Sequence, residues 1–161
     1  MLSTLGAMAG VLAKGMGFAQ ERGIDPAILL TDRLRPDMFP LTRQVQVACD
    51  MAKGGAARLA GQEPPAFPDT ETTFDDLLLR TERTIDFLGT FTPEDIDGSE
   101  TRHIVLKVGG REMRFTGLFY LTQFVLPNMY FHTTTAYLIL RHNGVPLVKK
   151  DFLAPLDAAI G

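Results

Sequence analysis

The sequence contains one cysteine, Cys49, among 161 residues, so no disulfide bond can form within a chain. A single thiol is compatible with a reducing compartment, and we expect a cytoplasmic protein. Positive charge is also scarce, because 16 Lys and Arg residues face 19 Asp and Glu residues, which gives a net charge of −3. Without a basic surface, we expect binding neither to nucleic acid nor to anionic membranes.

Long apolar runs are missing as well. No segment reaches the roughly 18 consecutive apolar residues of a membrane span. The N-terminal stretch MLSTLGAMAGVLAKGMGF has no positive residue before its apolar part and is interrupted by Lys14. We interpret it as a core helix, with a secretory signal as the minor alternative. The length and the 45% apolar content suit one globular domain over residues 1–161.

Histidine is the third scarce residue, with only His103, His132 and His142 in the chain. A catalytic zinc or nickel site needs about three protein ligands. His132 and His142 are ten residues apart in one predicted helix, which separates them by roughly 15 Å along its axis. His103 falls in a predicted hairpin, so the three imidazoles cannot share an ion within one subunit. We expect no metal cofactor, and a divalent metal at His132 is the less favoured alternative.

Helical periodicity is present in four segments, at residues 3–21, 40–62, 73–89 and 116–142. We expect Ser3 to cap the first helix, and Thr72 or Thr73 to cap the third. A short helical turn is predicted after Pro26.

Small residues recur on one predicted face of the first helix, and these are Gly6, Gly10, Ala13 and Gly17. Glycine weakens a helix, so this pattern calls for a reason. Close approach of another helix is one interpretation, and a flexible N-terminal helix is the other.

The period changes to two in IVLKV-GG-REMRF, which predicts a β-hairpin that turns at Gly109-Gly110. Pairing outward from the turn sets Val108 opposite Arg111. The same register places four apolar residues on one face of a half-buried ribbon: Ile104, Leu106, Met113 and Phe115.

The fourth helical segment carries Pro127, which predicts a kink because proline removes one backbone donor. Gln123 and Asn128 flank this break. They either repair its hydrogen bonds, or the kink shapes a cavity one turn before His132. The tail from Val145 to Gly161 contains two prolines and is expected to wrap the surface.

His132 lies in the middle of this apolar helix, with Asn128 and Thr135 on the same face. One interpretation is a neutral core histidine bonded to a threonine or a backbone carbonyl. The other is a pocket histidine that binds a ligand or acts as a general base. Cys49 is expected to be a buried, inert thiol, and Asp50 to be an exposed charge or a partner of Gln46.

Two stretches, MFPLTRQVQVACDMAKGGAARLAG and MYFHTTTAYLILRHNGVPLVKKDFL, carry a family resemblance. They resemble the DinB/YfiT-like superfamily of four-helix proteins and, more closely, a bacterial family of unknown function within it. The resemblance implies an all-α, DinB-like four-helix bundle with a small β-hairpin before the last helix. It also implies a homodimer, for which the small-residue face of the first helix leaves room.

Many members of this superfamily bind a divalent metal through three histidines. The resemblance matches His132 to the last of these ligands, whereas Asn128 and a position near Gln46 carry neutral amides. Amides are poor ligands for such metals, so the resemblance implies a lost metal triad. We expect Gln46, Asn128 and His132 to face one another in a polar pocket, with Asp50 and Thr135 as further candidate residues.

Three functions remain open on this basis. The leading interpretation is an inter-helix pocket around His132 that binds a small molecule. The second is a divergent metal- or thiol-dependent enzyme of transferase or hydrolase type that uses His132. The third is a structural or dimeric interaction module.

Overall fold

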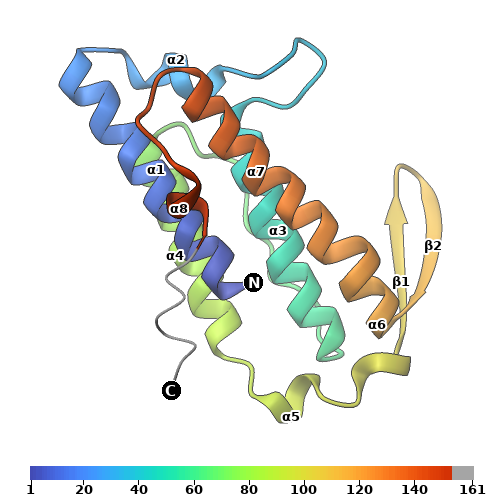
Figure 1. The fold of residues 1–161 in the computed structure, drawn as a ribbon. Coiled ribbons are helices and arrows are strands. Elements are labelled where there is room, and N and C mark those ends of the chain that lie inside the picture. Colours follow the sequence, from blue (N-terminus) through green and yellow to red (C-terminus); the bar gives the residue numbers. More distant parts are fainter. Residues whose placement is uncertain (154–161) are drawn as a thin grey trace.

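The computed structural model describes residues 1–153, and for Val108 it describes the backbone alone. Four long helices form a bundle (Figure 1). They are α1 (Leu2–Arg22), α3 (Leu41–Leu59), α4 (Phe74–Gly89) and α7 (Leu126–His142). The predicted all-α fold with a hairpin before the last helix is confirmed.

Shorter elements connect and cover the bundle. They are α2 (Pro26–Thr31), α5 (Pro93–Ile96), the 3-10 turn Ser99–Thr101 and α8 (Lys149–Phe152). The part of the predicted tail at residues 145–153 includes α8, which packs against α1 with Lys14 Nζ 2.7 Å from an Asp151 carboxylate oxygen. The rest of the predicted tail, residues 154–161, lies outside the described residues.

Helix ends follow local sequence signals with one exception. The Thr73 hydroxyl accepts the Asp76 backbone N–H at 3.1 Å, and the Asp76 carboxylate accepts the Thr73 N–H at 2.9 Å, which together start α4. Gly23 ends α1 with a left-handed φ of 64°. The expectation that Ser3 caps α1 is wrong, because the helix begins at Leu2 and Met1 is its N-cap.

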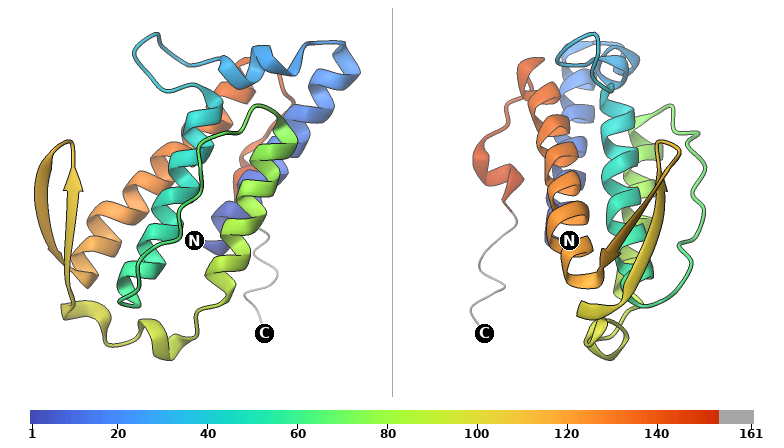
Figure 2. Two further views of the ribbon diagram at one scale, coloured as in Figure 1. Left: turned by 180° about the vertical axis from the view of Figure 1, so that it is seen from behind. Right: turned by 90° about the vertical axis from the view of Figure 1, so that its right-hand side faces the viewer.

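The core lies between two helix pairs, with α3 against α7 and α1 against α4 (Figure 2). An apolar stripe of α3 is buried and consists of Leu41, Val45, Ala48, Ala52, Ala56 and Leu59. From α7, Met129, Ile139 and Leu140 complete this core with no exposed surface. Burial of these apolar faces is the main force that holds the bundle together.

Helix α1 is long and apolar enough to cross a membrane by length and composition, a test that a core helix of a globular protein also passes. Its Leu5, Leu12 and Ala19 are fully buried in the bundle. This packing agrees with the interpretation of the segment as a core helix.

Within residues 1–153, the small-residue face of α1 does not pack against another helix. A side chain added at Gly6, Gly10 or Gly17 would meet nothing within 4 Å, and Ala13 is exposed. The close approach occurs instead at Gly15, where an added Cβ would lie 2.9 Å from Leu140 Cδ2. The expected close approach of another helix to the predicted face is therefore not found in the described part of the chain.

The segment predicted as one helix from residue 116 has three parts. Helix α6 (Gly117–Phe119) leads into a π-helical stretch, Tyr120–Val125, and then into α7. Pro127 lies in the first turn of α7, where the lack of an N–H is tolerated. The Asn128 amide donates to the Phe124 carbonyl at 2.6 Å. Asn128 therefore supplies a hydrogen bond to the irregular backbone, which was one of the two roles expected for it.

Strands β1 (His103–Val108) and β2 (Arg111–Thr116) pair in the predicted register, with Val108 opposite Arg111. Ile104 at the base of the hairpin is buried, with 4% of its surface exposed, whereas Met113 is 38% exposed. The predicted burial of one face is thus correct near the base and wrong at Met113, because the hairpin tip projects from the bundle (Figure 1).

Candidate functional site

His132 is buried in α7, with 8% of its surface exposed, and faces α3. Its Nδ1 lies 2.7 Å from Oε1 of Gln44, a side chain that is 1% exposed. The Gln44 Nε2 group donates to the Phe39 backbone carbonyl at 2.9 Å. This second bond fixes the orientation of the amide, because only the NH₂ end can donate to a carbonyl.

The fixed amide determines the tautomer of His132. Since Gln44 presents its oxygen, Nδ1 of the neutral imidazole must carry the proton and donate it, which leaves a lone pair on Nε2. Within residues 1–153, Nε2 has no hydrogen-bond partner. The fully buried side-chain atoms that lack a partner do not include Nε2, so this nitrogen retains some exposed surface. The lone pair is therefore accessible from outside.

Two exposed aromatic rings lie beside the imidazole of His132. The Phe39 ring stacks near the imidazole with centroids 6.5 Å apart, and the Phe131 ring meets it edge-on at 5.2 Å. Phe39 is 51% exposed and Phe131 is 57% exposed. The arrangement offers a hydrogen-bond acceptor between two apolar surfaces.

The charge state of His132 follows from its surroundings. Burial lowers the pKa of the imidazole below its ordinary value of 6.5, and the nearby positive charge of Arg43 lowers it further. His132 is therefore neutral at pH 7 and keeps the Nε2 lone pair.

Gln46 does not join His132, contrary to the sequence prediction. Its side chain accepts a hydrogen bond from Arg43 Nη1 at 3.1 Å and donates to a Glu71 oxygen at 2.8 Å. Two residues on a helix differ by roughly 200° in direction, so Gln44 and Gln46 point to different sides of α3. The phase of the buried stripe was the available signal, because Gln44 lies three residues after Leu41 and four before Ala48.

Asn128 and Thr135 are likewise occupied by the backbone of their own helix. The Asn128 amide bonds to Phe124, and the Thr135 hydroxyl donates to the Phe131 carbonyl at 2.7 Å. The predicted cluster of Gln46, Asn128 and His132 therefore does not form. The pair of His132 and Gln44 takes its place.

Asp50 belongs to a second polar cluster, centred on Arg80. The Arg80 side chain is 2% exposed and lies within 3.0 Å of carboxylate oxygens of Asp50, Asp69 and Glu71. Lys53 adds a 3.0 Å contact to Asp50. Of the two alternatives for Asp50, the pairing with Gln46 is therefore wrong, and the charge is half-buried in ion pairs instead of exposed. This cluster fastens the irregular segment 62–73 to α3 and α4.

Glu71 is the most buried carboxylate of that cluster, with a side chain that is 10% exposed. Burial by itself raises the Glu71 pKa, but hydrogen bonds from Arg80 and Gln46 outweigh it and leave the pKa below its ordinary value. Glu71 is thus ionised at neutral pH, and the carboxylates of the cluster are occupied by ion pairs within the protein.

Cys49 is fully buried beside Thr81, with its sulfur 3.8 Å from the threonine hydroxyl. Burial raises the pKa of the thiol, so it remains protonated at neutral pH. The position agrees with the predicted inert thiol.

The donors around His132 do not fit a three-histidine metal centre. Within residues 1–153, no three His, Cys, Asp or Glu side chains lie close enough together to hold a metal ion. His132 is hydrogen-bonded to the Gln44 amide and lies beside two phenyl rings. An amide is a poor ligand for a transition metal, and a phenyl ring offers no donor atom.

The fold is that of a DinB-like helical protein. A solved structure described as a DinB family member protein from Shewanella denitrificans is 40% identical and superposes with a TM-score of 0.88, covering 96% of this chain and 88% of that chain. A family model described as Domain of unknown function (DUF1993) matches residues 1–153, and the chain belongs to this family. A comparison with curated proteins yields no match. The resemblance noted in the sequence is confirmed.

Proposed function

We propose that the surface around His132 binds a neutral small molecule that carries a hydrogen-bond donor next to an apolar or aromatic group. The observation that carries this proposal is the chain of two hydrogen bonds from His132 through Gln44 to the Phe39 carbonyl. It orients the ring and keeps the Nε2 lone pair directed outward, where a hydroxyl or an N–H of a ligand can donate to it. Phe39 and Phe131 supply apolar contact on either side.

The test uses phenol, which has a donor and a ring, and its methyl ether anisole, which has the ring without the donor. The readout is the ¹⁵N signal of His132 Nε2 during titration. We expect phenol to shift this signal in a saturable manner and anisole to leave it nearly unchanged. Equal responses to both compounds, or a proton found on Nε2 instead of Nδ1, would overturn the proposal.

Matched variants separate the site from general surface binding. His132→Leu should abolish the phenol response of the remaining site signals, including the amides of Phe39 and Phe131. His142→Leu removes an exposed imidazole at the end of the same helix and should leave the response as in the unaltered protein. Loss of binding in both variants would count against a role for His132.

An enzymatic role for the same residue is the second candidate, and the same lone pair favours it. A neutral imidazole held in one tautomer by a hydrogen bond is the arrangement that a general base requires. In this version His132 removes a proton from the bound donor group. Elemental analysis that finds about one zinc, nickel or iron per purified chain would favour the metal-dependent form of this alternative over metal-free binding.

A further inference from the structure

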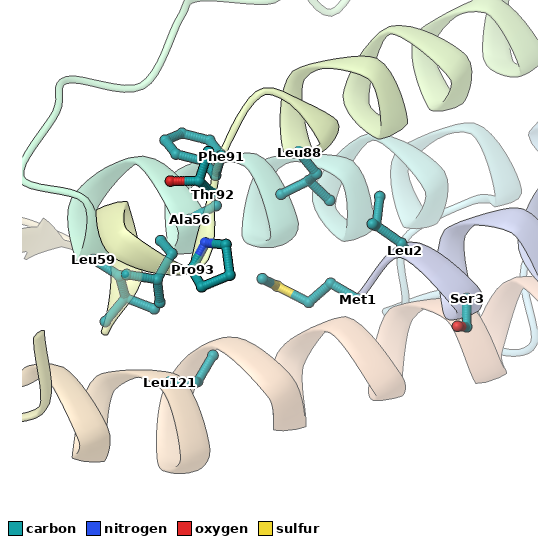
Figure 3. A pocket seen from close by; sticks show the side chains of 11 residues that line it. Met1, Leu2, Ser3, Ala56, Leu59, Leu88, Phe91, Thr92, Pro93 and Leu121 are labelled. Atoms are coloured by element: carbon teal, nitrogen blue, oxygen red, sulfur yellow. The ribbon is translucent and has the colours of Figure 1, made fainter. Parts of the chain in front are cut away.

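The structure contains a cavity of about 440 Å³ at the opposite end of the bundle from His132. It lies where the start of α1, the end of α3, the turn after α4 and the π-helical stretch come together (Figure 3). Leu59 and Gln44 are fifteen residues apart on α3, so the cavity lies roughly 22 Å from the His132 site along the helix axis. None of its lining residues belongs to that site.

The floor of the cavity is formed by buried apolar side chains. Ala56, Leu59 and Leu88 line it and are 3%, 2% and 7% exposed. Figure 3 shows Leu88 and Leu121 reaching toward the same space from different segments. The exposed residues Ser3, Thr92 and Pro93 form its edge, so the cavity opens to solvent on that side.

The cavity results from the way the bundle is divided. Leu88 belongs to the main core, whereas Leu59 belongs to a smaller apolar cluster with Tyr120 and Val125. The π-helical stretch Tyr120–Val125 changes the helical phase between α6 and α7 and places Leu121 against the cavity. Such π-helical stretches occur often at functional positions of helices.

We infer that this cavity is a binding site for a neutral, mainly apolar small molecule of about 10 to 15 non-hydrogen atoms. The volume is near the lower end of the roughly 300–1,000 Å³ of small-molecule pockets and equals about 15 water volumes. No side chain that lines it carries a charge, and the one charged group of a lining residue is the Met1 α-ammonium, whose pKa is lowered by burial. A cationic ligand would therefore be desolvated without a partner and repelled by this ammonium. The Thr92 hydroxyl is already bonded to Asp95 at 3.1 Å, which leaves apolar contact as the main attraction.

The test uses naphthalene, a neutral ten-carbon probe without a hydrogen-bond donor, and 1-naphthylmethylammonium as its cationic counterpart. Methyl signals of leucine are followed by NMR during titration of the unaltered protein. We expect saturable shifts at Leu59, Leu88 and Leu121 with naphthalene, and at least tenfold weaker binding of the ammonium compound at the same leucines. Because naphthalene cannot donate to His132, its result is independent of the function proposed above.

A cavity-filling variant with a matched control completes the test. Leu121→Trp places an indole in the cavity and should weaken naphthalene binding at least tenfold. Leu138→Trp makes the same change at a 42% exposed position of α7 outside the cavity and should leave binding unchanged. Shifts confined to exposed leucines such as Leu118, equal binding of the ammonium compound at the cavity leucines, or equal effects of the two variants would overturn the inference. The methyl shifts of the unaltered protein decide the matter if Leu121→Trp does not fold.

Discussion

The Gln44 amide links the Phe39 backbone carbonyl to the Nδ1–H of the buried His132. Its importance lies in geometry as well as in stability, because it determines which imidazole nitrogen is available for binding. A glutamine without any charge thus sets the chemistry of the only buried histidine among the described residues.

We predict that Gln44→Leu lowers the free energy of unfolding by about 1–3 kcal/mol, because it leaves the buried Nδ1–H of His132 without its acceptor. Urea denaturation measures this change. The matched control is Gln123→Leu at an exposed position, which should change stability by no more than about 0.5 kcal/mol. Similar values for the two variants would contradict the bridging role of Gln44.

A pH dependence follows from the lowered pKa of His132. Unfolded His132 titrates near 6.5, and the folded side chain titrates below that value. As the pH falls through this window the unfolded state binds more protons than the folded state, so stability decreases on acidification and is retained above about pH 6.5. Urea midpoints between pH 7.5 and pH 5.5 should show this decline, and His132→Gln should reduce it. His142→Gln is the control and should keep it.

At the scale of elements, segment 62–73 between α3 and α4 has no helix or strand of its own. It runs along the outside of the bundle (Figure 2) and is held there by side chains. Asp69 and Glu71 from this segment reach Arg80, while the Phe67 ring lies 4.1 Å from Lys53 Nζ and 4.5 Å from Arg83 Cζ. Arg80 is therefore the main fastening of this segment.

We predict that Arg80→Leu destabilises the protein by about 3 kcal/mol and exposes segment 62–73. The value is the lower end of the range for removal of one partner from a buried ion pair, because each carboxylate keeps a second partner. Hydrogen exchange should become faster at residues 69–73. Arg114→Leu on the hairpin, whose side chain is 81% exposed, is the control and should leave both quantities nearly unchanged. Unchanged exchange in Arg80→Leu would contradict the fastening role.

Gly117 marks the tight junction between the hairpin and the last helical part. A Cβ added there would overlap the backbone carbonyl of Ser99, which cannot move away as a side-chain end could. We predict that Gly117→Ala destabilises the protein by about 1–3 kcal/mol in thermal unfolding. Gly89→Ala, at the exposed end of α4 with nothing within 4 Å, should be neutral or stabilising by up to about 1 kcal/mol.

At the scale of the whole molecule, the surface face of α1 formed by Gly6, Gly10, Ala13 and Gly17 has no partner within residues 1–153. We propose a homodimer in which a second chain approaches this face, because small residues permit close backbone contact. Light scattering at micromolar concentration should give twice the chain mass, and Gly10→Arg should shift it toward the monomer. Gly89→Arg is the control. If the unaltered protein is a monomer, the dimer proposal is wrong, and a flexible N-terminal helix becomes the explanation for these glycines.

How far the sequence predicted the structure depends on the distance over which each feature is encoded. The cap at Thr73, one of the two residues expected, and the hairpin register were predicted correctly, because each depends on residues a few positions apart. The phase of the α3 stripe could have placed Gln44, and not Gln46, on the buried face. That the partner of Gln44 is His132 depends on how α3 packs against α7, which no local signal records.

The amino-acid sequence alone determined that this chain forms a helical bundle of a recognisable family, with its three imidazoles too far apart for a three-histidine centre. Tertiary structure decided that His132 meets Gln44, that Arg80 gathers three carboxylates, and that a cavity remains beside Leu121. The physical reason is that each helical residue turns its side chain by about 100°, so contacts between helices depend on the rotation and height at which they pack. Those quantities are set by the whole core at once.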